Sequence, residues 1–307
     1  MSRACIDTRV VFAGVEFKNP VVTASGTFGF GREYAEYYSL SELGGVCTKG
    51  LTVKPRLGNP PPRMAETPMG MLNAVGLQNP GADEFIKTEL PFMRGFDTRV
   101  IANIAGESVE EYAELAEKLS DAGVDIIEVN VSCPNVKEGG MQFGVSPSAV
   151  ASVTREVRRR SRVPVMVKLS PNVTDIAEIA RAAEGEGADA VSLINTLLGM
   201  RIDIKTRRPL LANDTGGLSG AAVFPVAVRM VRQVYEAVKI PVLGMGGVTT
   251  GENAVEMLLA GASLVGVGTA SFSYPDAALS VRDGIAAYMR EYGVGAVSEL
   301  TGMAEMF

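Results

Sequence analysis

The sequence contains no histidine. This absence excludes the commonest general base, so any proton transfer must use cysteine, lysine, aspartate, glutamate or tyrosine. Cysteine itself is scarce, with 3 residues, Cys5, Cys47 and Cys133, at positions far apart in the chain. They include no CxxC pair, so the sequence predicts neither a disulfide framework nor a metal site.

Long apolar runs are also absent. No segment approaches the ~20 apolar residues that cross a bilayer, and Met1–Val10 lacks the apolar stretch of a secretory signal peptide. The net charge of -6 argues against nucleic acid or an anionic membrane surface as a partner. We therefore expect a soluble cytoplasmic protein in a reducing compartment.

Short runs rich in valine, isoleucine, leucine and alanine recur along the chain, with amphipathic segments between them. The eight runs are Val21–Ser25, Gly45–Lys49, Val100–Ala105, Ile126–Val131, Pro164–Leu169, Ala190–Asn195, Pro241–Met245 and Leu264–Gly268. Their apolar residues are nearly continuous rather than alternating, which is typical of strands covered on both faces.

Eight such strands alternating with helices predict an α/β fold, a closed (β/α)8 TIM barrel with inserted loops at the carboxyl ends of the strands. The alternative is an open doubly wound sheet, but no GxGxxG motif follows the first strand. No linker-like stretch divides the 307 residues, so we expect a single domain spanning residues 1–307.

Start signals mark several of the helices. Ser108–Glu111 has the pattern of a capping box, and Thr249–Glu252 repeats it. Ser146–Pro147 predicts an N-cap followed by proline at the first helical position. Two long connections, Leu51–Leu72 and Leu197–Ser219, interrupt the alternation; loops of this length are functional lids, interface elements or disordered. We hypothesise that Leu197–Ser219 covers the site.

Polar residues gather where the predicted strands end, and the active sites of barrels lie at these ends. Asn103, Asn130 and Asn195 could each be a turn residue that satisfies local backbone groups. Three at one depth favour fixed amides that recognise a planar heterocycle with alternating C=O and N–H groups. Lys49 and Lys168 suit an anionic carboxylate, an anionic reduced cofactor or a Schiff base.

Glycines end the last two predicted strands, in the pairs Gly246–Gly247 and Gly268–Thr269. Backbone N–H groups can approach an anion closely where no Cβ intervenes. Glycine pairs also occur as plain tight turns, but at the seventh and eighth strands of a barrel they predict a phosphate site.

Cys133 lies just past a strand end, in the segment Glu128–Asn135. A thiol there could act as a nucleophile or a base, and the alternative is a buried spare thiol. A free thiol titrates near about 8.5, so catalysis at neutral pH needs nearby positive charge or coupling to a driven proton transfer. Cys47, within an apolar run, and Cys5 are expected to be inert packing residues.

Together these residues resemble dihydroorotate dehydrogenase, the flavin enzyme of pyrimidine synthesis. The resemblance runs from Ala24 to Thr269. Its most specific parts are Asn130–Asn135, Asn73–Leu77, Thr48–Gly50, Gly246–Gly247 and Gly268–Thr269.

The class within the family depends on one loop. Val136–Gly140 and Phe143–Gly144 are most similar to the NAD-linked class 1B. The fumarate-linked class 1A usually has a different sequence in this loop. A cysteine rather than a serine at position 133, and the lack of a hydrophobic N-terminal extension, separate the chain from the membrane-bound quinone-linked class.

The resemblance implies that FMN lies in the barrel mouth. The implied cofactor-binding residues are Ser25, Lys49, Gly50, Asn103, Asn130, Lys168, Ile194, Gly220, Gly246, Gly247, Gly268 and Thr269. The implied residues for the substrate dihydroorotate are Lys49, Asn73, Ala74, Val75, Gly76, Leu77, Asn130, Asn195 and Thr196. In this assignment the catalytic residues are Cys133, which takes the proton from C5, and Lys168, which stabilises negative charge on the reduced flavin.

For class 1B the resemblance implies a separate electron-transfer subunit carrying FAD and a [2Fe–2S] cluster, in a heterotetramer of two catalytic and two electron-transfer subunits. The sequence itself shows no dinucleotide fingerprint and no cysteine cluster. The alternatives are a class 1A enzyme, a dihydropyrimidine dehydrogenase-like flavoprotein acting on uracil or thymine derivatives, a Schiff-base aldolase, and a flavin-binding scaffold subunit without turnover.

Overall fold

The structure, a computed structural model, describes residues 6–131 and 143–306. Within these residues eight parallel strands close into a barrel in the order β10-β15-β16-β3-β4-β7-β8-β9. The barrel strands are β3 (Val21–Thr23), β4 (Gly45–Cys47), β7 (Arg99–Ile104), β8 (Ile126–Asn130), β9 (Val165–Lys168), β10 (Ala190–Leu193), β15 (Val242–Met245) and β16 (Leu264–Val267). Each overlaps one of the eight predicted runs, so the predicted (β/α)8 barrel is confirmed.

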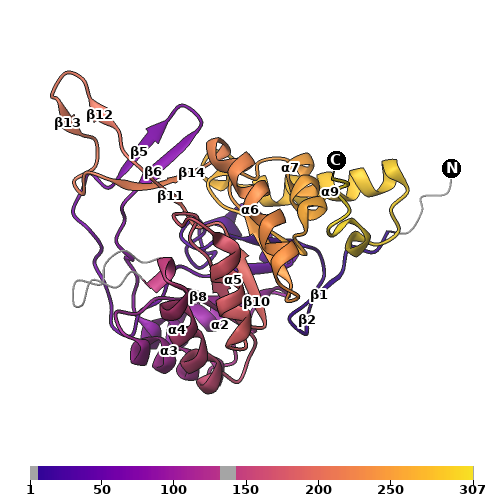
Figure 1. Ribbon diagram of the computed structural model, residues 1–307, viewed down its shortest axis with the longest axis horizontal. Coiled ribbons are helices and arrows are strands. Elements are labelled where there is room, and N and C mark those ends of the chain that lie inside the picture. The colour runs from indigo at the N-terminus through magenta and orange to yellow at the C-terminus, as the bar shows by residue number, and fades with distance from the viewer. Residues whose placement is uncertain (1–5, 132–142, 307) are drawn as a thin grey trace.

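Helices form the outer layer of the barrel (Figure 1). Neighbouring helices pack on one another in chain order, from α3 on α4 through α6 on α7 and α7 on α9. The α-helices are α1 (Ala82–Glu84), α2 (Leu90–Met93), α3 (Val109–Asp121), α4 (Pro147–Arg160), α5 (Ile176–Gly185), α6 (Phe224–Ala237), α7 (Gly251–Ala260), α8 (Ala270–Ser273) and α9 (Ala277–Tyr292). Shorter helical turns are η1 (Tyr34–Glu36), η2 (Leu40–Glu42), η3 (Phe85–Glu89), η4 (Phe143–Val145), η5 (Ala221–Val223) and η6 (Val297–Leu300).

The predicted starts of α3 and α4 are correct in position but differ from the prediction in their hydrogen bonds. Ser108 caps α3 by accepting from Glu111 N at 3.3 Å, whereas the Glu111 carboxylate accepts from Glu107 N rather than closing the box. At α4, Ser146 is the N-cap and Pro147 the first helical residue, as predicted, but the Ser146 side chain makes no capping bond.

The capping box of α7 lies one residue later than predicted. Thr250, not Thr249, is the N-cap, and its hydroxyl accepts from Asn253 N at 3.2 Å. The Asn253 side chain accepts in return from Thr250 N, which makes Asn253 rather than Glu252 the reciprocal partner. A side-chain amide oxygen can fill this position as a glutamate would.

Parts of the two long connections pair with each other in one sheet, so of the predicted alternatives disorder does not apply to these paired parts. The antiparallel sheet has the order β11-β14-β6-β5, with β5 (Met64–Thr67) and β6 (Gly70–Asn73) from the first connection and β11 (Leu197–Gly199) and β14 (Gly216–Ser219) from the second. A further hairpin of β12 (Ile202–Asp203) and β13 (Arg208–Pro209) projects away from the barrel (Figure 1). Near the N-terminus, β1 (Val10–Phe12) and β2 (Val15–Phe17) form a separate hairpin.

The barrel strands are covered on both faces. Every residue of β9, β10, β15 and β16 is buried, which accounts for their nearly continuous apolar sequences. No helix in the described ranges is long and apolar enough to cross a membrane. Several strands end one or two residues before the predicted limit, and some of the residues that follow them, such as Ser25, Lys49 and Asn195, line the mouth.

Candidate active site

Two adjoining cavities lie at the carboxyl ends of the barrel strands. They have volumes of about 440 Å³ and about 420 Å³, which is within the usual range for small-molecule sites. The residues that line both are Lys49, Asn73, Val75, Asn195 and Thr196. Two bound molecules could therefore touch at this shared boundary.

The first cavity collects most of the predicted cofactor residues. Those in its wall are Ser25, Lys49, Lys168, Ile194, Gly220, Gly246, Gly247, Gly268 and Thr269. Asn130 lines the second cavity instead. Asn103 is fully buried, and a Cβ added to Gly50 would lie 2.9 Å from its Oδ1. Apart from Gly220, the predicted set thus comes from the carboxyl-terminal parts of all eight barrel strands.

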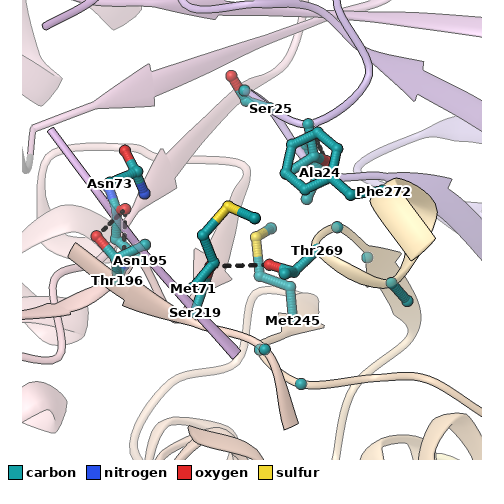
Figure 2. A pocket seen from close by; sticks show the side chains of 18 of the residues that line it. Ala24, Ser25, Met71, Asn73, Asn195, Thr196, Ser219, Met245, Thr269 and Phe272 are labelled. Carbon is teal, nitrogen blue, oxygen red and sulfur yellow. Dashed lines mark hydrogen bonds between the residues drawn. The ribbon is translucent and has the colours of Figure 1, made fainter. Parts of the chain in front are cut away.

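One end of the first cavity is built from glycine backbone. Gly246, Gly247 and Gly220 have φ values of +123°, +77° and +98°, which side-chain-bearing residues rarely adopt. A Cβ on Gly247 would lie 2.8 Å from the Gly220 carbonyl oxygen. Beside them, the Thr269 hydroxyl donates to Ser219 Oγ at 2.8 Å (Figure 2). This end is lined by small residues, and the backbone N–H groups of such residues can approach a phosphate closely.

Positive charge lies at the boundary between the cavities. Burial, together with the positive charge of Arg63, lowers the pKa of Lys49. Arg63 also lines the first cavity, where it donates to the Asn59 carbonyl oxygen at 3.1 Å and to the Gln78 side chain. Lys49 therefore holds its proton less firmly than an exposed lysine, and an anion beside it would raise its pKa again.

Every residue of the predicted substrate set lines the second cavity. Their side chains are held by one another: Asn195 Nδ2 donates to Asn130 Oδ1 at 3.1 Å, and Asn195 Oδ1 accepts from Thr196 N at 2.8 Å. Asn73 Nδ2 donates to the Gly217 carbonyl oxygen at 3.3 Å. Figure 2 shows Asn73, Asn195 and Thr196 grouped on one side of the first cavity, apart from Thr269.

Sequence reasoning missed polar residues of the second cavity, including Ser170 and Asn172. Asn172 Nδ2 donates to the Thr196 carbonyl oxygen at 3.0 Å, and Asn172 Oδ1 accepts from Leu198 N at 2.9 Å. Asn172 therefore fixes the point where the chain leaves β10 for the inserted sheet. Its position shortly after a strand end was the available signal.

Sequence reasoning also missed Glu128, a fully buried carboxylate inside the barrel. Its Oε2 lies 3.7 Å from Lys168 Nζ, and Lys168 is also buried, with an exposed fraction of 5%. The signal was a charged residue within the apolar run Ile126–Val131, because a parallel barrel strand has no solvated face.

The structure tests the prediction for one of the three cysteines, Cys47. Cys47 is buried as expected, but it is more than a packing residue, because its thiol donates to Glu128 Oε2 at 3.2 Å. Burial, reinforced by the negative charge of Glu128, raises the pKa of the Cys47 thiol, which keeps it a donor. Cys133 and Cys5 lie outside the described residues, as does Val136–Gly140.

Comparison with known proteins places the chain in a family. The family model for dihydroorotate dehydrogenase matches residues 8–289. The chain is 57% identical over 297 residues to "Dihydroorotate dehydrogenase B (NAD(+)), catalytic subunit" of Alkaliphilus metalliredigens, covering 97% of this chain and 98% of that protein. It is 55% identical over 294 residues to the protein of the same name from Geobacillus kaustophilus, covering 95% of this chain and 94% of that protein.

A solved structure supports the fold. The crystal structure of DHODH from Eimeria tenella in complex with ferulenol superimposes with a TM-score of 0.79 at 20% identity, covering 99% of this chain and 90% of that one. The family match extends over nearly all of the barrel, and the relatives align along almost their whole length. The chain belongs to the dihydroorotate dehydrogenase family.

Proposed function

We propose that this chain is the catalytic subunit of an NAD-linked dihydroorotate dehydrogenase, which oxidises dihydroorotate to orotate in de novo pyrimidine (UMP) biosynthesis. The observation that carries the proposal is the pair of joined cavities with Lys49 at their boundary. Relatives named for this reaction share more than half of their residues with the chain. Residues 1–307 would form one FMN-binding domain.

The residues of the first cavity fit FMN. Asn103 Oδ1 is a buried acceptor with no hydrogen-bond partner among the described residues, and it suits a ring N–H donor. The glycines Gly220, Gly246 and Gly247 line this cavity with positive φ values, and their backbone N–H groups would bind the phosphate. Lys168, which lines the same cavity, would supply positive charge that stabilises the negative charge of the reduced ring. Bound FMN would supply the hydride acceptor.

The second cavity would hold the substrate ring against the flavin. Lys49 pairs with the substrate carboxylate, and the amides of Asn73, Asn130 and Asn195 bind the alternating C=O and N–H groups of the ring. During oxidation a proton leaves C5, a hydride leaves C6, and a double bond forms between these carbons. Cys133 accepts the proton; an unchanged oxidation rate in Cys133→Ala would show that this thiol is not the base.

The electrons would leave through a second subunit. We propose that it carries FAD and a [2Fe–2S] cluster and reduces NAD, in a heterotetramer of two catalytic and two electron-transfer chains. The proposal is supported by the words "catalytic subunit" in the names of the relatives and by the lack of a dinucleotide fingerprint in the sequence.

Lys49 distinguishes orotate from uracil, the ligand of the dihydropyrimidine dehydrogenase-like alternative, because uracil lacks the carboxylate. We expect Lys49→Met to weaken orotate binding about 10- to 100-fold, since a hydrogen bond to a charged group contributes about 1.5–3 kcal/mol. Titration of the flavin absorbance with orotate measures this. As a control, uracil binding should be equally weak in both proteins; an unchanged orotate Kd together with tight uracil binding would favour the alternative.

A further inference from the structure

A polar layer lies inside the barrel directly beneath the site. Side chains at alternate positions of a strand share a face, so Cys47, Glu128 and Ser192 lie one layer below Lys49, Asn130 and Ile194 in the mouth. All three lower residues are buried, and all belong to different strands. A barrel interior is usually filled by branched apolar side chains, so a polar layer at this depth is unusual and suggests a role in the site above it.

Glu128 is the centre of this layer. Its Oε2 accepts from Asn103 Nδ2 at 2.5 Å and from the Cys47 thiol at 3.2 Å, and its Oε1 accepts from Ser192 Oγ at 2.7 Å. Lys168 Nζ lies 3.7 Å from the same Oε2. These three hydrogen bonds, all from described residues, point toward the carboxylate, which is the arrangement expected for an ionised acid that can only accept.

The carboxylate fixes how Asn103 faces the site. Because the carboxylate can only accept hydrogen bonds, Asn103 must turn its NH2 group toward Glu128 and its Oδ1 away from Glu128. That Oδ1 is the buried acceptor without a partner among the described residues, and it lies next to Gly50. A neutral side chain at position 128 would also be compatible with the opposite orientation of the Asn103 amide. The negative charge of Glu128 therefore selects the orientation in which Asn103 Oδ1, an acceptor, points away from Glu128.

Glu128 also counterbalances Lys168. Two opposite charges this close and this well buried interact much more strongly than an exposed pair, and removing one leaves the other uncompensated. Lys168 lines the first cavity, whereas Glu128 lies behind it. The positive charge that reaches a molecule in the cavity is therefore reduced by the carboxylate.

We propose that Glu128 is a positioning residue that orients Asn103 and Lys168 toward the flavin and limits, by its negative charge, how strongly Lys168 favours the reduced flavin. This inference rests on the proposed function, because it takes the molecule in the first cavity to be FMN. Glu128 does not touch the flavin; it acts through Lys168, which lines the first cavity, and through Asn103 beside Gly50.

The decisive variant is Glu128→Gln, which keeps the shape and removes the charge. In the flavin-loaded protein we expect the ratio of reduced to oxidised flavin at a fixed potential to rise about tenfold, equal to about 30 mV for a two-electron couple. The ratio is measured by reductive titration against a reference dye. A rise smaller than threefold would overturn the role of the charge.

Ser192→Ala is the matched control, because it removes one hydrogen bond from the same carboxylate but leaves the charge in place. We expect its ratio to stay within threefold of the wild-type value. If Ser192→Ala raised the ratio as much as Glu128→Gln, packing of the layer rather than charge would be responsible, and the proposal would fail.

A second measurement needs no flavin, and so separates this proposal from the proposed function. In the flavin-free chain, Lys168→Met should lower the urea midpoint by leaving Glu128 unpaired, and adding Glu128→Gln should recover at least half of that loss. Additive losses would show that the two charges are not coupled. Failure of the wild-type chain to bind FMN would contradict the proposed function, while this cycle would still decide whether Glu128 and Lys168 act together.

Discussion

Lys49 holds a charge that its surroundings disfavour in the free protein. Burial, together with the positive charge of Arg63, lowers the pKa of Lys49 below the ordinary value of 10.5. Between the lowered and the ordinary pKa the folded chain binds fewer protons than the unfolded chain, so stability rises with pH in that range. Below the lowered pKa, Lys49 is charged in both the folded and the unfolded chain, and its unfavourable surroundings lower the stability by the full amount. An anionic ligand beside Lys49 would offset this loss of stability.

This pKa predicts the pH dependence of ligand binding. The carboxylate of orotate favours protonated Lys49, so the orotate Kd should rise as the pH increases through the pKa of Lys49 in the free chain, by up to about tenfold per pH unit. Lys49→Arg is the control, because a guanidinium stays charged throughout. Flavin absorbance titrations from about pH 7 to 10 measure both. An equal rise in the arginine variant would assign the effect to another group.

At the scale of elements, the inserted sheet brings two segments that are far apart in the sequence together beside the two cavities. β6 and β14 pair with Gly217 opposite Asn73, so one insertion holds the other in register beside the site. A Cβ on Gly217 would lie 2.1 Å from Thr196 Oγ1. Because no side chain fits there, β14 packs directly against the end of β10.

Gly217→Ala should therefore displace Thr196 and weaken orotate binding by up to about 100-fold, since misplacement of a binding group by about 1 Å can have an effect of that size. We also expect it to destabilise the chain by about 1–3 kcal/mol through overpacking. Isothermal titration and urea unfolding measure the two effects.

Gly185→Ala provides the comparison. Gly185 ends α5, and a Cβ there would meet nothing within 4 Å, so the change should leave orotate binding unaltered and keep or raise stability. If both alanine variants bound orotate like the wild type, the close approach of β14 to Thr196 would not matter for the ligand.

At the scale of the whole molecule, the chemistry is confined to one end of the barrel. The strands supply a rigid, buried frame, and the residues that line both cavities follow their carboxyl ends. In our proposal this frame holds a flavin and a pyrimidine together, and another chain transfers the electrons to NAD.

We accordingly predict that the isolated flavin-loaded chain oxidises dihydroorotate with an artificial dye as acceptor but does not reduce NAD. Adding the electron-transfer subunit should confer NAD reduction without changing the dye-coupled rate. Stopped assays that follow orotate and NADH in parallel provide the measurement. Rapid NAD reduction by the isolated chain would contradict this division of labour and the need for a partner.

The sequence by itself determined the barrel and the end at which its site lies. Continuous apolar runs specify strands covered on both faces, and polar residues such as Lys49 and Asn195 directly after such runs identify the mouth. These are local signals, because burial on both faces is imposed on each strand separately. The family resemblance added the assignment of individual residues to flavin and substrate.

Only the tertiary structure decided which atoms meet. Glu128, Asn103, Cys47 and Ser192 come from four strands, and their hydrogen bonds depend on the register of a closed barrel rather than on any local pattern. The pairing of the two insertions was likewise invisible, since strands this short carry little periodicity. Local preferences set the elements, whereas contacts between distant segments follow from how the closed barrel packs them together.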